Sequence, residues 1–366
     1  MAPAVSWKTA AAVAVAALAC KRADLFWNNG RSIPLLSFWR EPGFSYDQLP
    51  DLSGKVALVT GANTGLGRET ALQLALANAT VLMGCRDMGR CEAAVSELRA
   101  EALRVKGLSS RYPQLKAVYI DLADLRQVAT AADALFMELD ALHILVNNAG
   151  VATQFPHTLT RDGVELTFQA NYLGHFLLTT LLLPLLERSA PARVVHLSSG
   201  AHRGAPLEGV PLSREGVNDP ETPGPYARYG MAKLANLVFA RELDRRFFSK
   251  GIFSNAVHPG VVATDMLRPQ NFEAMLGPQL GPLALGLARL RNSLFAYSPQ
   301  QAALSLLYCA ASPEVETLAV HGELVVPVAT RWQARHPMAE DADFGKALWR
   351  FSQQLVSEAL EPARAT

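Results

Sequence analysis

The sequence has little cysteine and no long block of a single charge. It contains four cysteines, 34 lysines and arginines, and 33 aspartates and glutamates, so its formal net charge is +1 over 366 residues. No two cysteines form a Cys-x-x-Cys pair, and no histidine pair lies near them at zinc-ligand spacing. We therefore expect reduced, mostly buried thiols rather than a metal or redox site. Because there is also no basic block and no stripe of alternating basic and aromatic residues, a nucleic-acid partner is not expected.

Near its start, the chain also lacks an apolar run of ordinary transmembrane length. The run from residue 10 to residue 20 is uninterrupted, but it is shorter than the roughly 20 residues that a spanning helix prefers. Lys8 precedes the run, and Lys21 and Arg22 follow it. We expect residues 1–22 to associate with a membrane such as the endoplasmic reticulum, with the body of the protein facing the cytosol. A cleaved signal peptide, or a frayed helix on a cytoplasmic or organellar protein, is the alternative. Residues 23–51 form an extension before the first predicted strand.

The remainder of the chain has the composition of a globular domain, with 50% hydrophobic and 18% charged residues in the whole sequence. Short apolar runs predict strands at residues 55–60, 80–84, 115–122, 142–146, 193–199, 253–257 and 323–328. Helical patterns lie between many of them, at residues 68–78, 87–105, 123–139, 162–188 and 227–248. This alternation predicts an α/β fold with one doubly wound parallel sheet of the Rossmann type, in a single domain at residues 52–360.

One predicted helix is unusually apolar. Residues 177–186 are mostly leucine, but Pro184 interrupts them. A helix of the core or of a subunit interface therefore explains the run better than a membrane span does. A homodimer is the partner that the second of these interpretations implies.

A glycine-rich turn follows the first predicted strand. The segment Gly61-Ala-Asn63-Thr-Gly65-Leu66-Gly67 lies between this strand and a helix, which is the context that a dinucleotide-binding turn requires. Glycines let the backbone approach phosphate, and the amides that begin the helix offer donors at the positive end of its dipole. We therefore expect this turn to bind a dinucleotide.

The end of the second predicted strand favours NADP(H) over NAD(H). Sites that prefer NAD usually place an acidic residue there to bind the ribose hydroxyls. This sequence has Arg86 instead, which can pair with a 2′-phosphate, although Asp87 follows directly.

Other polar residues also follow predicted strands. Asp121, Asn148 and Ser199 come after the third, fourth and fifth strands, and Pro259 and Gly260 come after the sixth. Ligands of open α/β sheets bind beyond the carboxyl ends of the strands, so these residues are expected to converge with the glycine turn.

Tyr229 and Lys233 supply the chemistry that such a site needs. They lie four residues apart, so on a helix they share one face. A neighbouring ammonium favours phenolate and lowers the tyrosine pKa below its usual value of about 10. Tyr226 lacks this arrangement, because Gly230 stands four residues after it.

Taken in order, these motifs resemble the short-chain dehydrogenase/reductases. The shared motifs are Thr60-Gly-Ala-Asn-Thr-Gly-Leu-Gly67, Asn147-Asn-Ala-Gly150, Ser199, Tyr229-x-x-x-Lys233 and Pro259-Gly260. Finer features are similar to the retinol dehydrogenase and WW-domain oxidoreductase branch, although no WW domain is found here. They are Cys85-Arg86, Phe168-Gln-Ala-Asn171-Tyr-Leu-Gly-His175-Phe, Lys233-Leu-Ala-Asn236 and Val257-His-Pro-Gly260. The resemblance covers residues 52–360.

The resemblance implies an oxidoreductase that moves a hydride between a nicotinamide and a carbonyl or alcohol carbon. It implies that Tyr229 is the general acid or base and that Lys233 lowers its pKa. In this reading Ser199 binds the substrate oxygen, and Asn171 binds a water of the proton relay. The implied cofactor-binding residues are Gly61, Asn63, Gly65, Leu66, Gly67, Arg86, Asp121, Asn148, Tyr229, Lys233, Val262 and Thr264. His175, His202 and His258 are expected to be structural, because the tyrosine already supplies the acid.

Two segments are expected to shape the substrate pocket. Residues 204–225 form a Gly- and Pro-containing loop between Ser199 and Tyr229 that is longer than in many family members. Residues 265–300 occupy the position of the family's substrate lid, and their Met, Leu and Phe content favours an apolar substrate such as a retinoid, a steroid or a lipid aldehyde. A lid that packs on its own core explains the same composition. Two alternative functions are a C=C reductase of a pigment-like substrate and a non-catalytic dinucleotide-binding scaffold, and the intact catalytic set argues against the scaffold.

Overall fold

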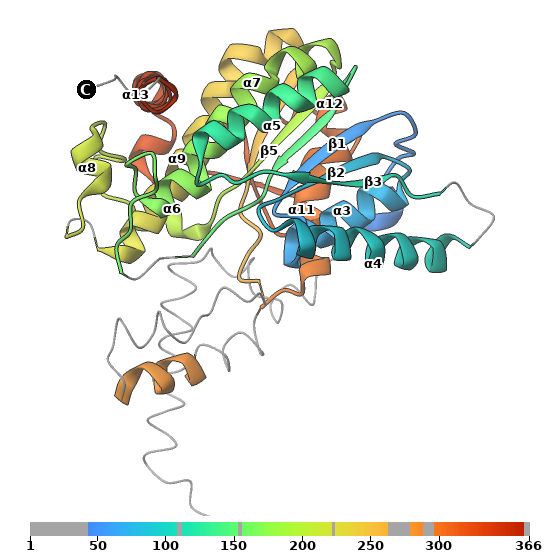
Figure 1. The fold of residues 1–366 in the computed structure, drawn as a ribbon, viewed down its shortest axis with the longest axis horizontal. Helices are drawn as coiled ribbons and strands as arrows, with labels where there is room; N and C mark the ends of the chain where they lie inside the picture. The colour runs from blue at the N-terminus through green and yellow to red at the C-terminus, as the bar shows by residue number, and fades with distance from the viewer. Residues whose placement is uncertain are drawn as a thin grey trace, which may run out of the picture.

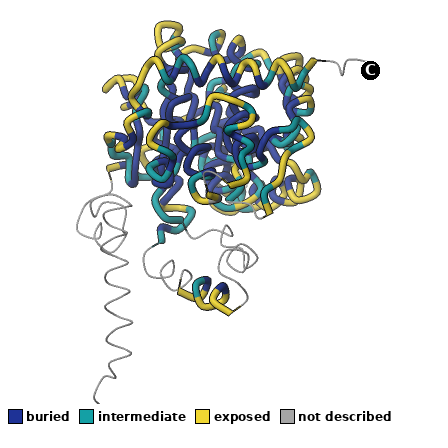
Figure 2. The backbone as a smooth tube through the Cα atoms, turned by 90° about the vertical axis from the view of Figure 1, so that its left-hand side faces the viewer, coloured by how far each residue is buried: buried dark blue, intermediate teal, exposed yellow. Residues whose placement is uncertain are grey.

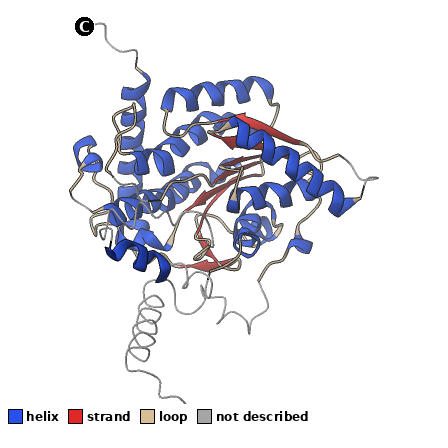
Figure 3. Cartoon of the chain, turned by 60° about the horizontal axis from the view of Figure 1, so that its bottom comes forward, coloured by secondary structure: helices blue, strands red, loops and turns tan. Residues whose placement is uncertain are grey.

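A single twisted sheet forms the centre of the protein. The structure, a computed structural model, describes residues 43–107, 112–152, 156–221, 224–262, 279–287 and 296–361. Its eight strands lie in the order β3-β2-β1-β4-β5-β6-β7-β8, and helices flank them on both sides (Figures 1 and 3). The strands are β1 Val56–Thr60, β2 Thr80–Cys85, β3 Leu115–Tyr119, β4 Ile144–Asn147, β5 Ala192–Leu197, β6 Ile252–Val257, β7 Leu324–Val326 and β8 Thr330–Trp332. Strands β1 to β7 pair in parallel, which confirms the predicted doubly wound α/β fold.

Each face of the sheet carries its own hydrophobic core. In β1, Leu58 faces one core while Ala57 and Val59 face the other, as the alternation of side chains along a strand requires. The first face is covered by α5 Leu125–Glu138, α7 Gly174–Arg188, α9 Pro225–Phe247 and α13 Ala342–Leu360. The second is covered by α3 Gly65–Leu76, α4 Met88–Lys106 and α11 Pro299–Ala311. Buried residues fill the interior between these layers (Figure 2).

The leucine-rich helix α7 belongs to the core of the chain itself. Leu178, Leu182 and Leu186 are fully buried, and α5 and α13 pack on the same face of the sheet. From α13, the Trp349 ring lies 5.1 Å from the ring of Phe176. The core interpretation of residues 177–186 is therefore confirmed, and a homodimer stays a prediction.

Three segments differ from the expected secondary structure. The helix predicted at residues 162–188 begins only at Leu166, because Gly163 has a φ of 69° and Glu165 caps the helix by accepting a hydrogen bond from the amide of Phe168 (2.7 Å). It comprises α6 Leu166–Phe168, the π-helical turn η2 Gln169–Leu173, and α7. Strand β8 was not predicted, and it pairs antiparallel with β7. The expected loop at residues 204–225 contains the short helix α8 Arg214–Asn218, and η3 Gly200–Gly204, a 3-10 helix, precedes this loop.

The described part of the extension packs on the second face of the domain. Phe44 is buried and meets the ring of Tyr308 edge to face, with ring centroids 5.5 Å apart. The Tyr46 hydroxyl lies 3.0 Å from Glu69 Oε1 of α3 and 2.6 Å from the carbonyl oxygen of Gln300 in α11. The apolar run of residues 10–20 lies outside the described residues. Within the described ranges, no helix combines the length and apolarity needed to span a bilayer.

Candidate active site

The strand register brings the sequence-predicted polar residues to one edge of the sheet. Val59 pairs with Val146, Asn147 pairs with His196, and Leu197 pairs with Val257. The strands therefore end level with one another, and the residues that follow them lie along the same carboxyl edge.

The glycine turn is fixed by contacts with the end of β4. The Asn148 side chain donates a hydrogen bond to the carbonyl oxygen of Thr60 (2.8 Å). A Cβ atom at Gly67 would lie 2.4 Å from both Asn148 Nδ2 and the carbonyl oxygen of Gly61, and one at Gly61 would lie 2.9 Å from the Cα of Ala149. These glycines are required by close backbone packing, and φ values of 64° and 56° at Gly61 and Gly65 add a conformational requirement.

The amino end of α3 is suited to a pyrophosphate. Its N-cap residue, Thr64, makes no side-chain capping bond. In contrast, Asp87 caps α4 and Ser298 caps α11 through hydrogen bonds to backbone amides. The first amides of α3 thus lack the side-chain acceptor that the other two helices have, and donors of this kind bind phosphate oxygens. The residues present fit a dinucleotide.

Arg86 stands at the end of β2, where the sequence predicts a contact with the cofactor. It is exposed, directly after the carboxyl end of β2. The preceding residue, Cys85, forms a disulfide with Cys91 in the first turn of α4, with the two Cα atoms 6.1 Å apart. The expectation of reduced thiols is therefore wrong for this pair, which the strand-to-helix turn brings together. Cys309 is free and buried.

The structure describes four of the other predicted cofactor residues and leaves one outside the described ranges. Asp121 follows β3 and its Oδ1 accepts a hydrogen bond from the amide of Ala123 (3.0 Å). Asn63 lies partly buried in the glycine turn, and Leu66 is buried in α3. Val262 lies beyond the carboxyl end of β6 and forms an isolated β-bridge with Tyr297. Thr264 lies outside the described residues.

Ser199 and Tyr229 meet at this edge. Tyr229 is in the first turns of α9, and Ser199 precedes η3, where its Oγ accepts a hydrogen bond from the amide of Ala201 (3.2 Å). Burial raises the pKa of Tyr229 to about 12, although a hydrogen bond with the Ser199 side chain acts to lower it. The longer loop between these two residues does not separate them. It is held in part by α8, where Asn218 Oδ1 accepts a hydrogen bond from the amide of Glu165 (2.8 Å).

Lys233 lies on the same face of α9, one turn after Tyr229. Its Nζ is 5.6 Å from the centroid of the Tyr229 ring and donates a hydrogen bond to the carbonyl oxygen of Leu197 (2.9 Å). Burial lowers the pKa of Lys233 to about 7. The sequence predicts a lowered tyrosine pKa, but in this structure burial dominates both groups: it disfavours the phenolate and the ammonium alike.

Asn171 lies in the π-helical turn and is fully buried. Its Oδ1 accepts a hydrogen bond from the amide of Val151 (2.6 Å), and its Nδ2 donates to the carbonyl oxygen of Val151 (2.9 Å). A Cβ at Gly150 would lie 3.0 Å from Asn171 Oδ1 and 3.6 Å from Lys233 Nζ. Gly150 thus lets both side chains approach the same stretch of backbone.

Sequence reasoning assigned no role to Thr60 and Asn236, whose hydrogen-bond partners at this site are distant in the sequence, while His175 has the structural role expected of it. Thr60 Oγ1 lies 2.8 Å from His175 Nε2. Asn236 Nδ2 donates to the carbonyl oxygens of Asn171 (3.0 Å) and Leu197 (3.1 Å). The only signal available was their position within motifs already singled out for other residues.

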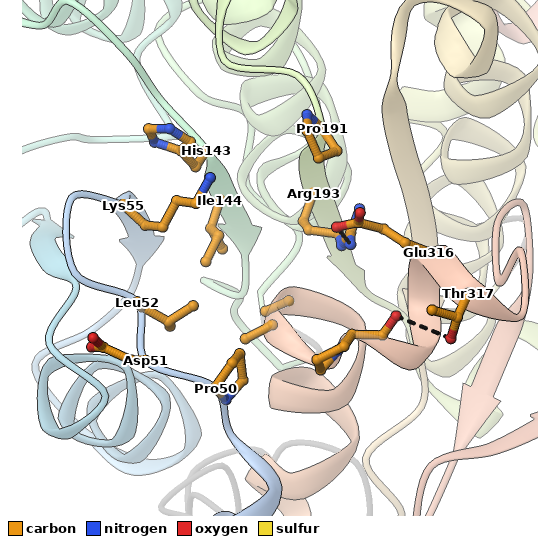
Figure 4. A pocket seen from close by; sticks show the side chains of 13 residues that line it. Pro50, Asp51, Leu52, Lys55, His143, Ile144, Pro191, Arg193, Glu316 and Thr317 are labelled. Atoms are coloured by element: carbon orange, nitrogen blue, oxygen red, sulfur yellow. Dashed lines mark hydrogen bonds and ion pairs between the residues drawn. The ribbon is translucent and has the colours of Figure 1, made fainter.

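A pocket of about 250 Å³ lies at the opposite edge of the sheet (Figure 4). Lys55, His143 and Arg193, which line it, are at the amino ends of β1, β4 and β5, and Arg193 pairs with Glu316. This pocket is therefore far from the groups described above.

The chain is similar to known proteins in sequence and in fold. Residues 55–211 match the family model of short chain dehydrogenases. Retinol dehydrogenase 13 of Mus musculus is 38% identical over 311 residues, which cover 84% of this chain and 86% of that protein. The WW domain-containing oxidoreductase of Homo sapiens is 37% identical over 313 residues, 85% of this chain and 70% of that protein. Among solved structures, an uncharacterised protein from Mycobacterium paratuberculosis has a TM-score of 0.63 and 30% identity, covering 86% of this chain and 98% of its own.

Proposed function

The chain belongs to the short-chain dehydrogenase/reductase family, and from this premise we propose that it is an NADP(H)-dependent oxidoreductase of apolar carbonyl and alcohol compounds. The general activity of the family is dinucleotide-dependent hydride transfer on C=O or CH–OH groups, and the proposal adds the cofactor and the class of substrate. The observation that carries the proposal is the meeting of Tyr229 and Ser199 at the edge of the sheet that also carries the glycine turn, with Lys233 one turn further along the same helix.

A bound nicotinamide dinucleotide would supply or accept the hydride. In the reducing direction the Tyr229 hydroxyl gives its proton to the substrate oxygen while the Ser199 hydroxyl donates a hydrogen bond to that oxygen. The phenolate left on Tyr229 is favoured by the ammonium form of Lys233 and then takes a proton from solvent. Alcohol oxidation is the reverse, with Tyr229 as the base.

The cofactor and substrate preferences rest on two exposed features. Arg86 follows β2 where an acidic residue would favour NAD(H), so it supports NADP(H). In the expected lid, the helix at residues 279–287 exposes Leu280, Leu283 and Leu287 by 58%, 62% and 60%. Their spacing places them on one helix face, which supports an apolar substrate such as a retinoid, a steroid or a lipid aldehyde.

The test is NADPH oxidation by the purified protein with a panel of aldehydes and ketones that includes retinal. We expect turnover by the wild type and a loss of about 10²- to 10⁴-fold in kcat for Tyr229→Phe, the range that a general acid contributes. Tyr226→Phe is the matched control, because it removes a hydroxyl from the same helix one turn earlier and should change kcat little. Full activity of Tyr229→Phe would refute the assignment of the acid, and NADPH binding without reduction of any carbonyl would favour a scaffold or a C=C reductase.

Membrane association through residues 1–22, with the domain facing the cytosol at the endoplasmic reticulum, is also part of the proposal. Its support is the apolar run of residues 10–20 between basic residues. Fractionation of cells that express the full chain or a variant lacking residues 1–22 should place the first with membranes and the second in the soluble fraction. A truncated protein that still sediments with membranes would contradict the anchor.

A further inference from the structure

The main-chain oxygen of Asn171 is bound by two side chains. His175 Nδ1 lies 3.1 Å from this oxygen, and Asn236 Nδ2 donates to it at 3.0 Å. In an ordinary α-helix this oxygen would accept only the amide four residues further on, but Asn171 is in the π-helical turn, where that pattern is interrupted. The side chain of His175, four residues after Asn171, thus binds the carbonyl that the turn makes available.

The partners of His175 determine which of its nitrogens carries the proton. A carbonyl oxygen only accepts, so Nδ1 must carry a hydrogen to bond with Asn171. Burial lowers the pKa of His175 to about 4, so at neutral pH the ring has one proton and Nε2 is an acceptor. The Thr60 hydroxyl, 2.8 Å away, then donates to Nε2, which is nearer than its other acceptor, the carbonyl oxygen of Val146 at 3.3 Å.

Thr60 extends this chain of hydrogen bonds to the cofactor side of the site. Its Oγ1 accepts hydrogen bonds from the amides of Asn148 and Ala149, each at 3.0 Å. Donation therefore runs in one direction, from the backbone after β4 to Thr60, from Thr60 to His175, and from His175 to Asn171. At its far end, the Asn171 side chain binds Val151 through two hydrogen bonds.

We propose that His175 is a positioning residue whose neutral Nδ1–H tautomer couples the glycine turn, through Thr60, to the backbone of Asn171. It touches neither substrate nor cofactor in this scheme. Its two nitrogens have separate tasks: Nε2 orients the Thr60 hydroxyl that supports the glycine turn, and Nδ1–H fixes the π-helical turn that presents Asn171 beside Gly150 and Lys233. The effect on catalysis rests on the proposed function, but the tautomer and the effect on dinucleotide binding do not.

Two variants separate the two tasks. In His175→Gln the side-chain amide reaches the place of Nε2, so the bond to Thr60 can persist while the bond to Asn171 is lost. In His175→Asn the amide reaches the place of Nδ1, with the opposite result. We expect about a 3- to 10-fold lower kcat with an unchanged NADPH dissociation constant for His175→Gln, the effect of one hydrogen bond. For His175→Asn we expect a dissociation constant raised by a similar factor and a retained kcat.

His196→Gln is the matched control, because His196 is an equally buried imidazole whose pKa is also lowered by burial, and its ring bonds with Asn147 rather than Thr60 or Asn171. It should lower the thermal unfolding midpoint without changing kcat or the NADPH dissociation constant selectively. If both His175 variants change kcat and the dissociation constant equally, the coupling is refuted.

The tautomer is measured on the wild-type protein, so this arm does not depend on any turnover. Histidine ¹H–¹⁵N correlation spectra, with the His175 signals assigned by their loss in His175→Gln, should show a neutral ring protonated at Nδ1 at pH 7. A ring protonated at Nε2, or an imidazolium, would overturn the inference even if the enzyme proves active. An inactive protein with the Nδ1–H tautomer and the expected shift in NADPH affinity would support the inference and refute the proposed function.

Discussion

At the residue scale, the proposed preference for NADP(H) depends on a single exposed side chain. Arg86 is the first residue beyond β2, and its position directly before α4 is fixed by the Cys85–Cys91 disulfide and by the Asp87 cap, whose Oδ1 accepts the amide of Arg90 at 3.0 Å. An arginine on such a rigid turn can form charge-assisted hydrogen bonds with a 2′-phosphate.

Replacing Arg86 with aspartate should reverse the preference between the two dinucleotides. A hydrogen bond with a charged group contributes about 1.5–3 kcal/mol, so we expect the NADPH dissociation constant to rise by about 10- to 100-fold while that of NADH stays the same or falls. Fluorescence titration with both dinucleotides measures the ratio directly. Arg90→Asp makes the same charge change in the first turn of α4, where the Arg90 side chain is 79% exposed. It therefore controls for the effect of the added negative charge on the electrostatic potential around the site. An unchanged ratio in Arg86→Asp would contradict the NADP(H) assignment.

Single residues also show what a sequence can and cannot reveal about a site. The spacing of Tyr229 and Lys233 predicted a shared helix face, and the structure places Lys233 Nζ near the Tyr229 ring. Their pKa shifts could not be predicted, because they depend on how much protein covers the pair. The bond between Thr60 and His175 joins residues that are 115 positions apart, and no local pattern records it.

At the scale of elements, the hydrophobic pattern was sufficient to predict an element wherever its apolar residues are buried. The strands from β1 to β6 are short apolar runs between helices, so both their existence and their parallel pairing followed from alternation. Strand β8 failed this criterion, because Thr330–Trp332 has three residues and none of them is fully buried.

The π-helical turn η2 shows a different limit. Its residues, Gln169–Leu173, are all buried and read as part of one long helix. Contacts from outside the helix accompany the turn: Asn236 donates to the backbone oxygen of Asn171, and the Asn171 side chain bonds with the backbone of Val151. Interruptions of this kind often mark functional positions, and here the interruption contains a predicted catalytic residue.

At the scale of the whole molecule, several histidines are buried within the domain. Burial lowers the pKa of His175 and His202 to about 4, and that of His196 and His258 to about 3. In the unfolded chain these rings would have their ordinary pKa of about 6.5. Four protons are therefore bound by the unfolded chain at a pH where the folded protein excludes them.

This difference predicts acid instability with a definite direction. Above about pH 7.5 the rings are almost entirely neutral in both states and contribute little pH dependence. As the pH falls below 6.5, the unfolded state gains protons first, so the free energy of unfolding decreases until the folded rings titrate near pH 4 and pH 3. Each ring contributes about 1.4 kcal/mol per pH unit in this window. Together they lower stability by about 5 kcal/mol per unit, which is comparable to the total stability of many domains.

Urea unfolding at pH 7.5, 6.5 and 5.5, together with direct measurement of proton uptake on unfolding, tests this expectation. The urea midpoint should fall slightly between the first two values and sharply at the third. His196→Phe should reduce proton uptake at pH 5.5 by about one, because one ring no longer titrates. The replacement keeps an aromatic ring beside Phe239, whose centroid lies 4.7 Å from that of His196. Stability that does not change between pH 7.5 and 5.5 would mean that these histidines are already charged, or accessible to water, in the folded protein.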